Sequence, residues 1–193
     1  MRYDPSRPAG RLLLTPEDKE APARALRLGR LGLGERADPA LDVYADRLAE
    51  LTGTPYAMVN FIDEHRQFFA GLHLSDVPFP VVRPDGTTPV LGRELARDHG
   101  FCPHVVVRRK ALVLEDVCDY PRFAGNPVVD EFGIRSYLGA PLIDSTGMVL
   151  GTVCVVDVEP RPWGRPGLET IKASAAELVA RLERREADGL PVL

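Results

Sequence analysis

The sequence predicts an α+β fold, in which an antiparallel sheet is flanked by helices near the two ends of the chain. Two pairs of short apolar runs are each joined by a polar turn, which is typical of β-hairpins and requires antiparallel pairing. Segments with helical spacing of apolar residues precede the first pair and follow the second. Strands and helices do not alternate as in a Rossmann fold, and neither GxGxxG nor a P-loop motif occurs, which excludes nucleotide enzymes of those classes.

The N-terminal region predicts an arm and a short helix. Residues 1–14 contain two prolines, one glycine and three arginines, which is typical of a mobile arm. Thr15 is expected to cap a helix that opens at Pro16 and ends at the glycines within 29–34. Pro22 weakens this helix, because proline lacks the backbone N–H that a helix interior needs.

A second helix is predicted more strongly. Asp38 is a typical N-cap, Pro39 suits the first helical position, and Gly53 ends the pattern. Helical spacing places five side chains on a face that we expect to be buried: Leu41, Tyr44, Ala45, Leu48 and Leu51.

The middle of the chain predicts two hairpins separated by irregular segments. YAMVNFID and QFFAGLHL form the first hairpin around DEHR, and IRSYLGAPLID and MVLGTVCVVD form the second around STG. Between them we expect a proline-rich loop over 75–92, a short helix broken at Gly100 or Pro103, a strand over ALVLEDV, and the loop DYPRFAGNP. In the second hairpin, alternation places Arg135 and Tyr137 on one face. It places Ile134, Ser136 and Leu138 on the other.

The last helix has a heptad-like apolar stripe about two heptads long. Two interpretations are open: the stripe packs on the protein's own sheet, or it extends into a parallel homodimer. Its members are Leu168, Ile171, Ala175, Leu178 and Leu182.

Composition limits the classes of function. With 193 residues, 45% of them hydrophobic, the chain suits one domain with extensions. The net charge is -4 and no run of five like charges occurs, so a nucleic-acid partner is not expected. No apolar run approaches the length of a membrane span, and the first residues lack the apolar core of a signal peptide. We therefore expect a cytoplasmic protein without a membrane partner.

Four motifs, in this order and at these intervals, resemble the GAF domain, a ligand-binding sensory module of bacterial signalling proteins. They are YAMVNFIDEHRQFFAG, GFCPHVV, LVLEDVCDYPRFAGNPVV and IRSYLGAPLIDSTGMVLGTVCVVDVEPR. The resemblance implies a GAF/PAS-like six-stranded antiparallel sheet, with terminal helices on one face. A ligand pocket roofed by loops and short helices is implied on the other. We accordingly expect an arm and short helix over 1–37, the GAF domain over 38–185, and a tail over 186–193.

The loop DYPRFAGNP would belong to the roof of that pocket. Arg122 offers a planar fork for a carboxylate or phosphate, and Tyr120 and Phe123 offer flat faces for a ring. Alternatively, Phe123 fills the core, Arg122 pairs with a neighbouring aspartate, and Asn126 caps a helical turn before a proline. Together with the other motifs, this gives ten candidate ligand-binding residues: Phe101, Cys102, His104, Asp116, Tyr120, Arg122, Phe123, Asn126, Arg135 and Tyr137.

The three cysteines have no CxxC spacing and suit reduced thiols. Cys154 lies in an apolar run and is expected to be buried as a small hydrophobic residue. Asp116 and Asp119 should raise the thiol pKa of Cys118. His99, Cys102 and His104 lack a second ligand pair, so no metal site is assigned.

Departures from known GAF subtypes narrow the function further. The pattern that cyclic-nucleotide-binding members share is missing after Phe132, and NPVVDEFG has no cysteine for a bilin. Cys102 is similar to one cysteine of free methionine sulfoxide reductases. The loop FAGNPVV, however, has no thiol where their catalytic cysteine lies, so we assign neither catalytic residues nor a cofactor.

Three functional hypotheses remain. The first is a stand-alone sensory domain that binds an unidentified small molecule and signals through a homodimer or a signalling-protein partner, since no output domain follows the last helix. The second is an association module with a degenerate pocket. The third is a thiol enzyme or redox sensor that uses Cys102 with Cys118.

Overall fold

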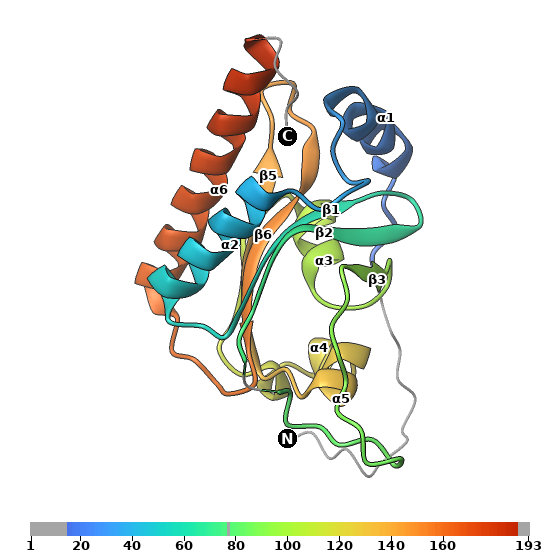
Figure 1. Cartoon of the computed structure of the whole chain (residues 1–193), viewed down its shortest axis with the longest axis vertical. Coiled ribbons are helices and arrows are strands. Elements are labelled where there is room, and N and C mark those ends of the chain that lie inside the picture. The colour runs from blue at the N-terminus through green and yellow to red at the C-terminus, as the bar shows by residue number, and fades with distance from the viewer. Residues whose placement is uncertain (1–14, 77, 189–193) are drawn as a thin grey trace.

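A computed structural model describes residues 15–76 and 78–188. Its centre is a six-stranded antiparallel sheet with the strand order β3-β2-β1-β6-β5-β4 (Figure 1), as the sequence predicts. The strands are β1 (Tyr56–Ile62), β2 (Arg66–Leu74), β3 (Glu94–Ala96), β4 (Leu112–Leu114), β5 (Ser136–Ile143) and β6 (Val149–Asp157). The helices are α1 (Ala21–Leu31), α2 (Pro39–Thr52), α3 (Cys102–Arg108), α4 (Pro121–Ala124), α5 (Pro127–Phe132) and α6 (Gly164–Ala187), with a 3-10 turn η1 (Val117–Asp119).

Helices cover both faces of the sheet. The long helices α2 and α6 lie across one face, which we call the helix face, and α3, α4 and α5 lie on the opposite side, which we call the roof face (Figure 1). Each central strand contributes to both layers: in β1, Val59 packs under the long helices and Met58 packs under the roof. Every residue of β1 and β6 is buried, which explains why these strands appear in the sequence as nearly continuous apolar runs.

Both predicted hairpins are confirmed, and aspartates shape their turns. The carboxylate of Asp63 accepts hydrogen bonds from the backbone N–H groups of His65 and Arg66, at 2.6 and 2.7 Å. The carboxylate of Asp144 accepts from the N–H groups of Thr146 and Met148 in the same way, at 3.0 and 2.9 Å. In each turn, a side chain supplies acceptors that the backbone of a tight reversal cannot supply.

The two N-terminal helices differ in how well they were predicted. The helix expected from Thr15 is wrong in its start, because α1 begins at Ala21 and has Pro22 in its first turn, where the missing N–H costs nothing. A helix opening at Pro16 would have placed Pro22 in its interior. The start of α2 is confirmed, since Asp38 accepts from the N–H of Ala40 at 2.6 Å. The predicted mobile arm over 1–14 lies outside the described residues.

Several irregular segments contain more structure than the sequence indicates. A short edge strand, β3, precedes the expected broken helix, which begins only at Cys102. The strand predicted over ALVLEDV pairs at three positions only, from Leu112 to Leu114. Ile134 lies before β5 begins, so strand alternation does not apply to it. It packs in the roof layer with Tyr137, which corrects the predicted faces, while Leu138 packs under the helices as expected.

The apolar stripe of α6 belongs to the protein's own core. Ile171, Ala175, Leu178 and Leu182 are all buried in the cluster that α6 forms with the sheet, which confirms the first interpretation of the stripe. A coiled coil through these residues is therefore wrong. In α2, Leu51 is 66% exposed, so it was wrongly placed on the buried face.

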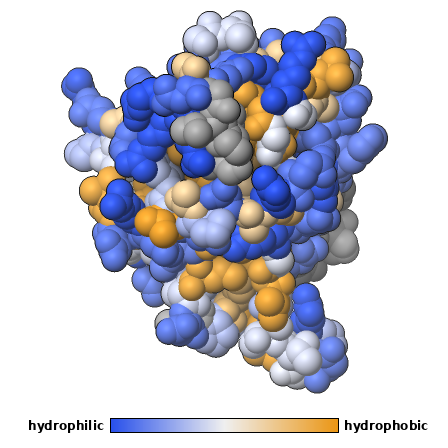
Figure 2. Space-filling view, turned by 45° about the horizontal axis from the view of Figure 1, so that its top comes forward, coloured by the Kyte–Doolittle hydropathy of each residue, from blue (hydrophilic) through white to orange (hydrophobic). Residues whose placement is uncertain are grey.

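Most of the surface visible in Figure 2 is hydrophilic, and apolar side chains form separate patches on it. This mixture is ordinary for a folded domain. Within 15–76 and 78–188, every helix is too short or too polar to span a lipid bilayer.

Candidate ligand cavity

A small cavity lies between the sheet and the roof. Its volume is about 50 Å³, and it opens against strands β1, β2, β5 and β6 on one side and against α3, α5 and the loop before β3 on the other. The residues that line it are Met58, Gln67, Phe69, Phe79, Leu91, Leu95, Gly100, Phe101, Cys102, Val128, Phe132, Ile134, Tyr137, Cys154 and Val156. None of these side chains belongs to Asp, Glu, Lys, Arg or His, so the wall is apolar apart from an amide, a phenol and two thiols.

The proline-rich loop closes one end of the cavity. Phe79 stacks on Tyr56 with ring centroids 4.5 Å apart and meets Phe132 edge-on at 5.0 Å. Leu91, at the other end of the loop, is also buried and lines the cavity. Two side chains of an otherwise exposed loop thus occupy space between the sheet and α5. The sequence indicated a loop here but gave no sign that Phe79 and Leu91 reach the site.

The floor is polar at one point, where three side chains meet. The Tyr137 hydroxyl on β5 lies 3.4 Å from Sγ of Cys102, and this Sγ lies 3.7 Å from Sγ of Cys154 on β6. Gly139 makes the arrangement possible, because a Cβ at that position would collide with the Tyr137 hydroxyl. Cys154 is buried as predicted, but its contact with Cys102 could not be foreseen from a separation of 52 residues.

Two buried amides form the adjoining wall. The amide nitrogen of Asn60 donates to Oε1 of Gln67 at 3.0 Å, and Nε2 of Gln67 donates to the carbonyl oxygens of Ala96 and His99 at 2.8 and 2.6 Å. Asn60 lies directly across from Thr152 in the sheet. Among the described residues, Oδ1 of Asn60 and Oγ1 of Thr152 have no hydrogen-bond partner, and both side chains are fully buried. Both side chains nevertheless act on the Cys102 thiol, whose pKa they lower.

The pKa values of the two thiols are shifted in opposite directions. A hydrogen bond from the Cys154 thiol lowers the pKa of Cys102, against the effect of burial, and Thr152, Tyr137 and Asn60 act in the same direction. The same hydrogen bond and burial raise the pKa of Cys154 well above its ordinary value. Burial also raises the pKa of Tyr137, whose hydroxyl therefore stays protonated as a donor. Cys102 is thus the thiol of the pair that ionises first.

Five of the ten predicted site residues lie in or directly behind this cavity. Phe101, Cys102 and Tyr137 line it. Phe123 meets the ring of Phe101 edge-on at 5.9 Å, and His104 meets Phe123 in the same way at 5.0 Å. Burial, followed by the nearby arginines, lowers the pKa of His104 to about 4, so its imidazole is neutral. These residues form one contiguous group, and ligand binding by them remains a prediction.

Asn126 has a structural role that the sequence analysis offered as an alternative. Its Oδ1 accepts from the N–H of Val128 at 3.3 Å and caps α5, which confirms the helical turn expected before Pro127. The same amide exchanges two hydrogen bonds with the backbone of Gly100, each 2.8 Å long. Asn126 therefore fastens α5 to the segment that leads into α3, and its side chain has little freedom to bind anything else.

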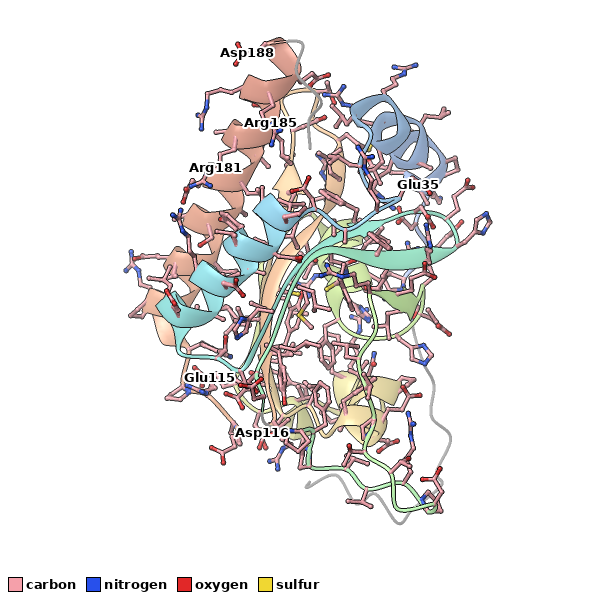
Figure 3. The ribbon with its side chains drawn as sticks, viewed as in Figure 1. Glu35, Glu115, Asp116, Arg181, Arg185 and Asp188 are labelled. Carbon is pink, nitrogen blue, oxygen red and sulfur yellow. The ribbon has the colours of Figure 1, made fainter. Side chains whose placement is uncertain are left out.

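Asp116 and Arg135 pair with each other at the lower end of the sheet, where Figure 3 labels Asp116. The guanidinium donates to both carboxylate oxygens, at 3.0 and 2.5 Å. This hydrogen bonding lowers the pKa of Asp116 and raises that of Arg135. Neither residue lines the cavity, so a role for them as direct contacts to a ligand in that cavity is wrong.

Tyr120 and Arg122 lie on the outer surface of the roof. Tyr120 is 39% exposed, and Arg122 is exposed with its guanidinium 5.7 Å from the Phe123 ring. Within the described part of the chain, Arg122 forms no ion pair, so the predicted partner aspartate is not used. Both side chains are exposed, and neither lines the cavity.

Cys118 lies apart from the other two thiols. It is half-buried, and its pKa is raised, first by burial and then by Asp116 and Asp119 as predicted. His65 is exposed, whereas His73 is half-buried and its Nδ1 forms a hydrogen bond of 2.7 Å with Oδ1 of Asp46. No group of three potential metal ligands occurs within residues 15–76 and 78–188.

Comparisons with known proteins find a domain family and a sequence relative that match most of this chain. A sequence model of the GAF domain matches residues 36–182. The chain is 31% identical over 172 residues to the cyclic di-GMP phosphodiesterase PA2567 of Pseudomonas aeruginosa, an alignment that covers 86% of this chain and 26% of that protein. The chain thus spans about a quarter of the length of this relative.

Solved structures at lower identity share the fold. The GAF domain of a phosphoenolpyruvate-protein phosphotransferase from Acinetobacter is 16% identical with a TM-score of 0.56, over 90% of this chain and 99% of that one. Free methionine-R-sulfoxide reductase from Neisseria meningitidis, solved in complex with its substrate, is 16% identical with a TM-score of 0.59, over 89% and 96%. At such identities the likeness concerns the fold alone.

Proposed function

Because the chain belongs to the GAF domain family, a family of sensory and signalling domains, we propose that it binds a small, uncharged and largely apolar molecule in the cavity under the roof. The observation that supports this proposal is the cavity wall. An anionic nucleotide or carboxylate buried there would have no cation beside it, and burying an unpaired charge costs several kcal/mol.

The volume limits the size of the ligand. An apolar cavity of about 150 Å³ is enough for benzene, whereas this one measures about 50 Å³. A ligand of one ring therefore requires Phe79 and Leu91 to move outward with their loop. A ligand can shift the protein from the closed to the open state only if it binds the open state more tightly. The apolar wall that becomes accessible when Phe79 moves outward would provide this preference.

A signal can pass from the cavity to the helix face through shared strands. Cys154 and Val156 of β6 line the cavity, and their neighbours Val153 and Val155 pack under the long helices. The similarity to part of a cyclic di-GMP phosphodiesterase favours a signal that regulates the turnover of a second messenger. We propose that this output runs through the helix face to a protein partner or to a second copy of the chain.

Thermal denaturation with matched probes tests the proposal. Phenol and indole should raise the midpoint of unfolding in proportion to their concentration, and benzoate, which has the size of phenol but a charge, should not. Val128→Phe, which fills the cavity from α5, should abolish the shift, while Arg122→Ala, on the outer roof, should retain it. An equal shift with benzoate, or a shift that survives Val128→Phe, would contradict the assignment.

A second candidate function is supported by one observation. Phe79 and Leu91 already fill the end of the cavity, as expected of an association module whose pocket has closed. In that case, none of the probes shifts the midpoint at any concentration, and sedimentation velocity shows a concentration-dependent dimer. A monomer that responds to phenol excludes this alternative.

A further inference from the structure

The sulfurs of Cys102 and Cys154 are in direct contact across the space between roof and floor. Their sulfurs lie 3.7 Å apart, and a disulfide needs about 2.05 Å, so a movement of less than 2 Å separates the two states. Cys102 begins α3 in the roof, while Cys154 lies at the middle of β6 in the floor. A bond between them would join roof and floor directly across one side of the cavity.

Polar groups surround this contact on several sides. The Tyr137 hydroxyl is 3.4 Å from the Cys102 sulfur, and Asn60 and Thr152 lie side by side on the neighbouring strands with buried oxygen atoms that lack a partner. An apolar site would leave a thiol inert, since burial disfavours the thiolate. Here the hydroxyl groups of Tyr137 and Thr152 can both donate hydrogen bonds to an anionic sulfur. These hydrogen bonds replace the stabilisation by water that the thiolate loses on burial.

The cavity provides space for a small oxidant beside both sulfurs. Cys102 and Cys154 both line it, and its volume of about 50 Å³ exceeds the roughly 10–15 Å³ of such space that one water needs. Hydrogen peroxide is little larger than a water molecule. Glutathione and protein thiols are far too large for such a space, so the site selects for small reagents.

We propose that Cys102 and Cys154 form a reversible disulfide when hydrogen peroxide enters the cavity, and that the domain is thereby a thiol-based peroxide sensor. In the first step, the Cys102 thiolate attacks one peroxide oxygen, the O–O bond breaks, and a sulfenic acid and hydroxide result. The hydroxide takes up the proton that Cys102 released on ionisation and becomes water. In the second step, the Cys154 thiol attacks that sulfur, and a second water leaves as the S–S bond forms. Two thiols lose two electrons and two protons in total, and one peroxide becomes two waters.

This assignment differs from the pairing that the sequence suggested, which joined Cys102 to Cys118. Cys118 is half-buried beside Asp116, and its sulfur makes no contact with the other two cysteines within the described residues. Cys118 therefore serves as an internal control, since it is more exposed than Cys102 and Cys154 but has a raised pKa, which disfavours the reactive thiolate.

The test is peroxide treatment of the folded protein, followed by alkylation in denaturant and mass spectrometry of the peptides. We expect a Cys102–Cys154 cross-link in the wild type and in Cys118→Ala, with the mass lowered by two hydrogens and restored by dithiothreitol. In Cys154→Ala, the Cys102 sulfenic acid should persist and should react with dimedone when the oxidised protein is unfolded in denaturant that contains this reagent. Reduced Cys102 and Cys154 in wild-type protein whose Cys118 is already oxidised would overturn the proposal, as would a Cys102–Cys118 bond.

Tyr137 provides a sharper version of the same test. Tyr137→Phe keeps the ring and removes the hydroxyl next to the Cys102 sulfur. We expect the disulfide to form several-fold more slowly and the pH midpoint of the rate of disulfide formation by peroxide to move upward. A purely structural role for Tyr137 would leave that midpoint unchanged. Circular dichroism before and after substitution separates loss of the donor from loss of the fold.

Discussion

The two faces of the sheet are covered in different ways, although the same strands supply both. The helix face is covered by α2 and α6, helices of 14 and 24 residues, and the Tyr44 hydroxyl there donates to the Ser174 carbonyl at 2.6 Å. The roof face is covered by helices of 7, 4 and 6 residues and by a loop, and it contains a cavity. Hollows also occur beside α6 on the helix face, but charged side chains help to line them, whereas the lining of the roof cavity is almost wholly apolar.

The largest expected effect compares one leucine from each face. Leu178→Ala in α6 should lower the free energy of unfolding by about 3 to 4 kcal/mol, because the rigid helix cannot move to fill the space. Leu91→Ala should cost about half as much, because its loop can adjust and the site already contains a cavity. Urea denaturation measures both. Equal losses would show that the roof is packed as rigidly as the helix face.

The second largest effect concerns Asn126, which fastens the roof helix α5 to the segment before α3. Asn126→Ala removes the cap of α5 and both hydrogen bonds to Gly100, and we expect a loss of about 2 kcal/mol. The roof should also become more sensitive to limited proteolysis than the helix face. If stability falls but cleavage remains evenly distributed, the roof and the sheet unfold together and the two faces are not separate in stability.

The elements that the sequence predicted well share a local cause. The hairpin turns and the start of α2 depend on side chains within four residues of the backbone they bond, such as Asp38 and Asp144. The cavity depends on contacts between distant segments. Phe79 meets Phe132, and Cys102 meets Cys154, through pairings that no local pattern encodes.

The errors at the candidate site have the same explanation. Residue type correctly indicated that Arg122 and Arg135 could bind an anion, but orientation decides whether they face a ligand. Arg135 pairs with Asp116, and Arg122 is exposed and does not line the cavity. By contrast, Gln67 was overlooked, although it is a polar residue near the start of an apolar strand and its amide donates hydrogen bonds to two carbonyl groups.

A pH effect of intermediate size should originate on the roof face. The pKa of His104 is lowered to about 4 by burial, and next by Arg122 and Arg108, against an ordinary value of 6.5. Between those values, the unfolded chain takes up a proton that the folded protein does not, so stability falls as the pH falls through this window. From pH 7 to 5.5, we expect His104 to account for about 1 kcal/mol of the loss.

Urea denaturation of His104→Phe at several pH values isolates this contribution. The variant keeps a ring against Phe123 and should lose less stability between pH 7 and 5.5 than the wild type. All other ionisable groups are the same in both proteins, so the difference between the two pH profiles isolates His104. Parallel pH profiles would mean that His104 is protonated as easily in the folded protein as in the unfolded one.

The smallest expected effect concerns the outer surface of the roof. Arg122→Ala should change stability by less than about 0.5 kcal/mol, because the side chain is exposed and forms no ion pair within the described residues. Its guanidinium does, however, lie 5.7 Å from the Phe123 ring, which packs behind the cavity wall. We therefore expect the affinity for phenol, measured by thermal shift, to be unchanged as well. If affinity falls while stability does not, the outer roof and the cavity are coupled through Phe123, and the conformation that a partner recognises would include the surface of α4.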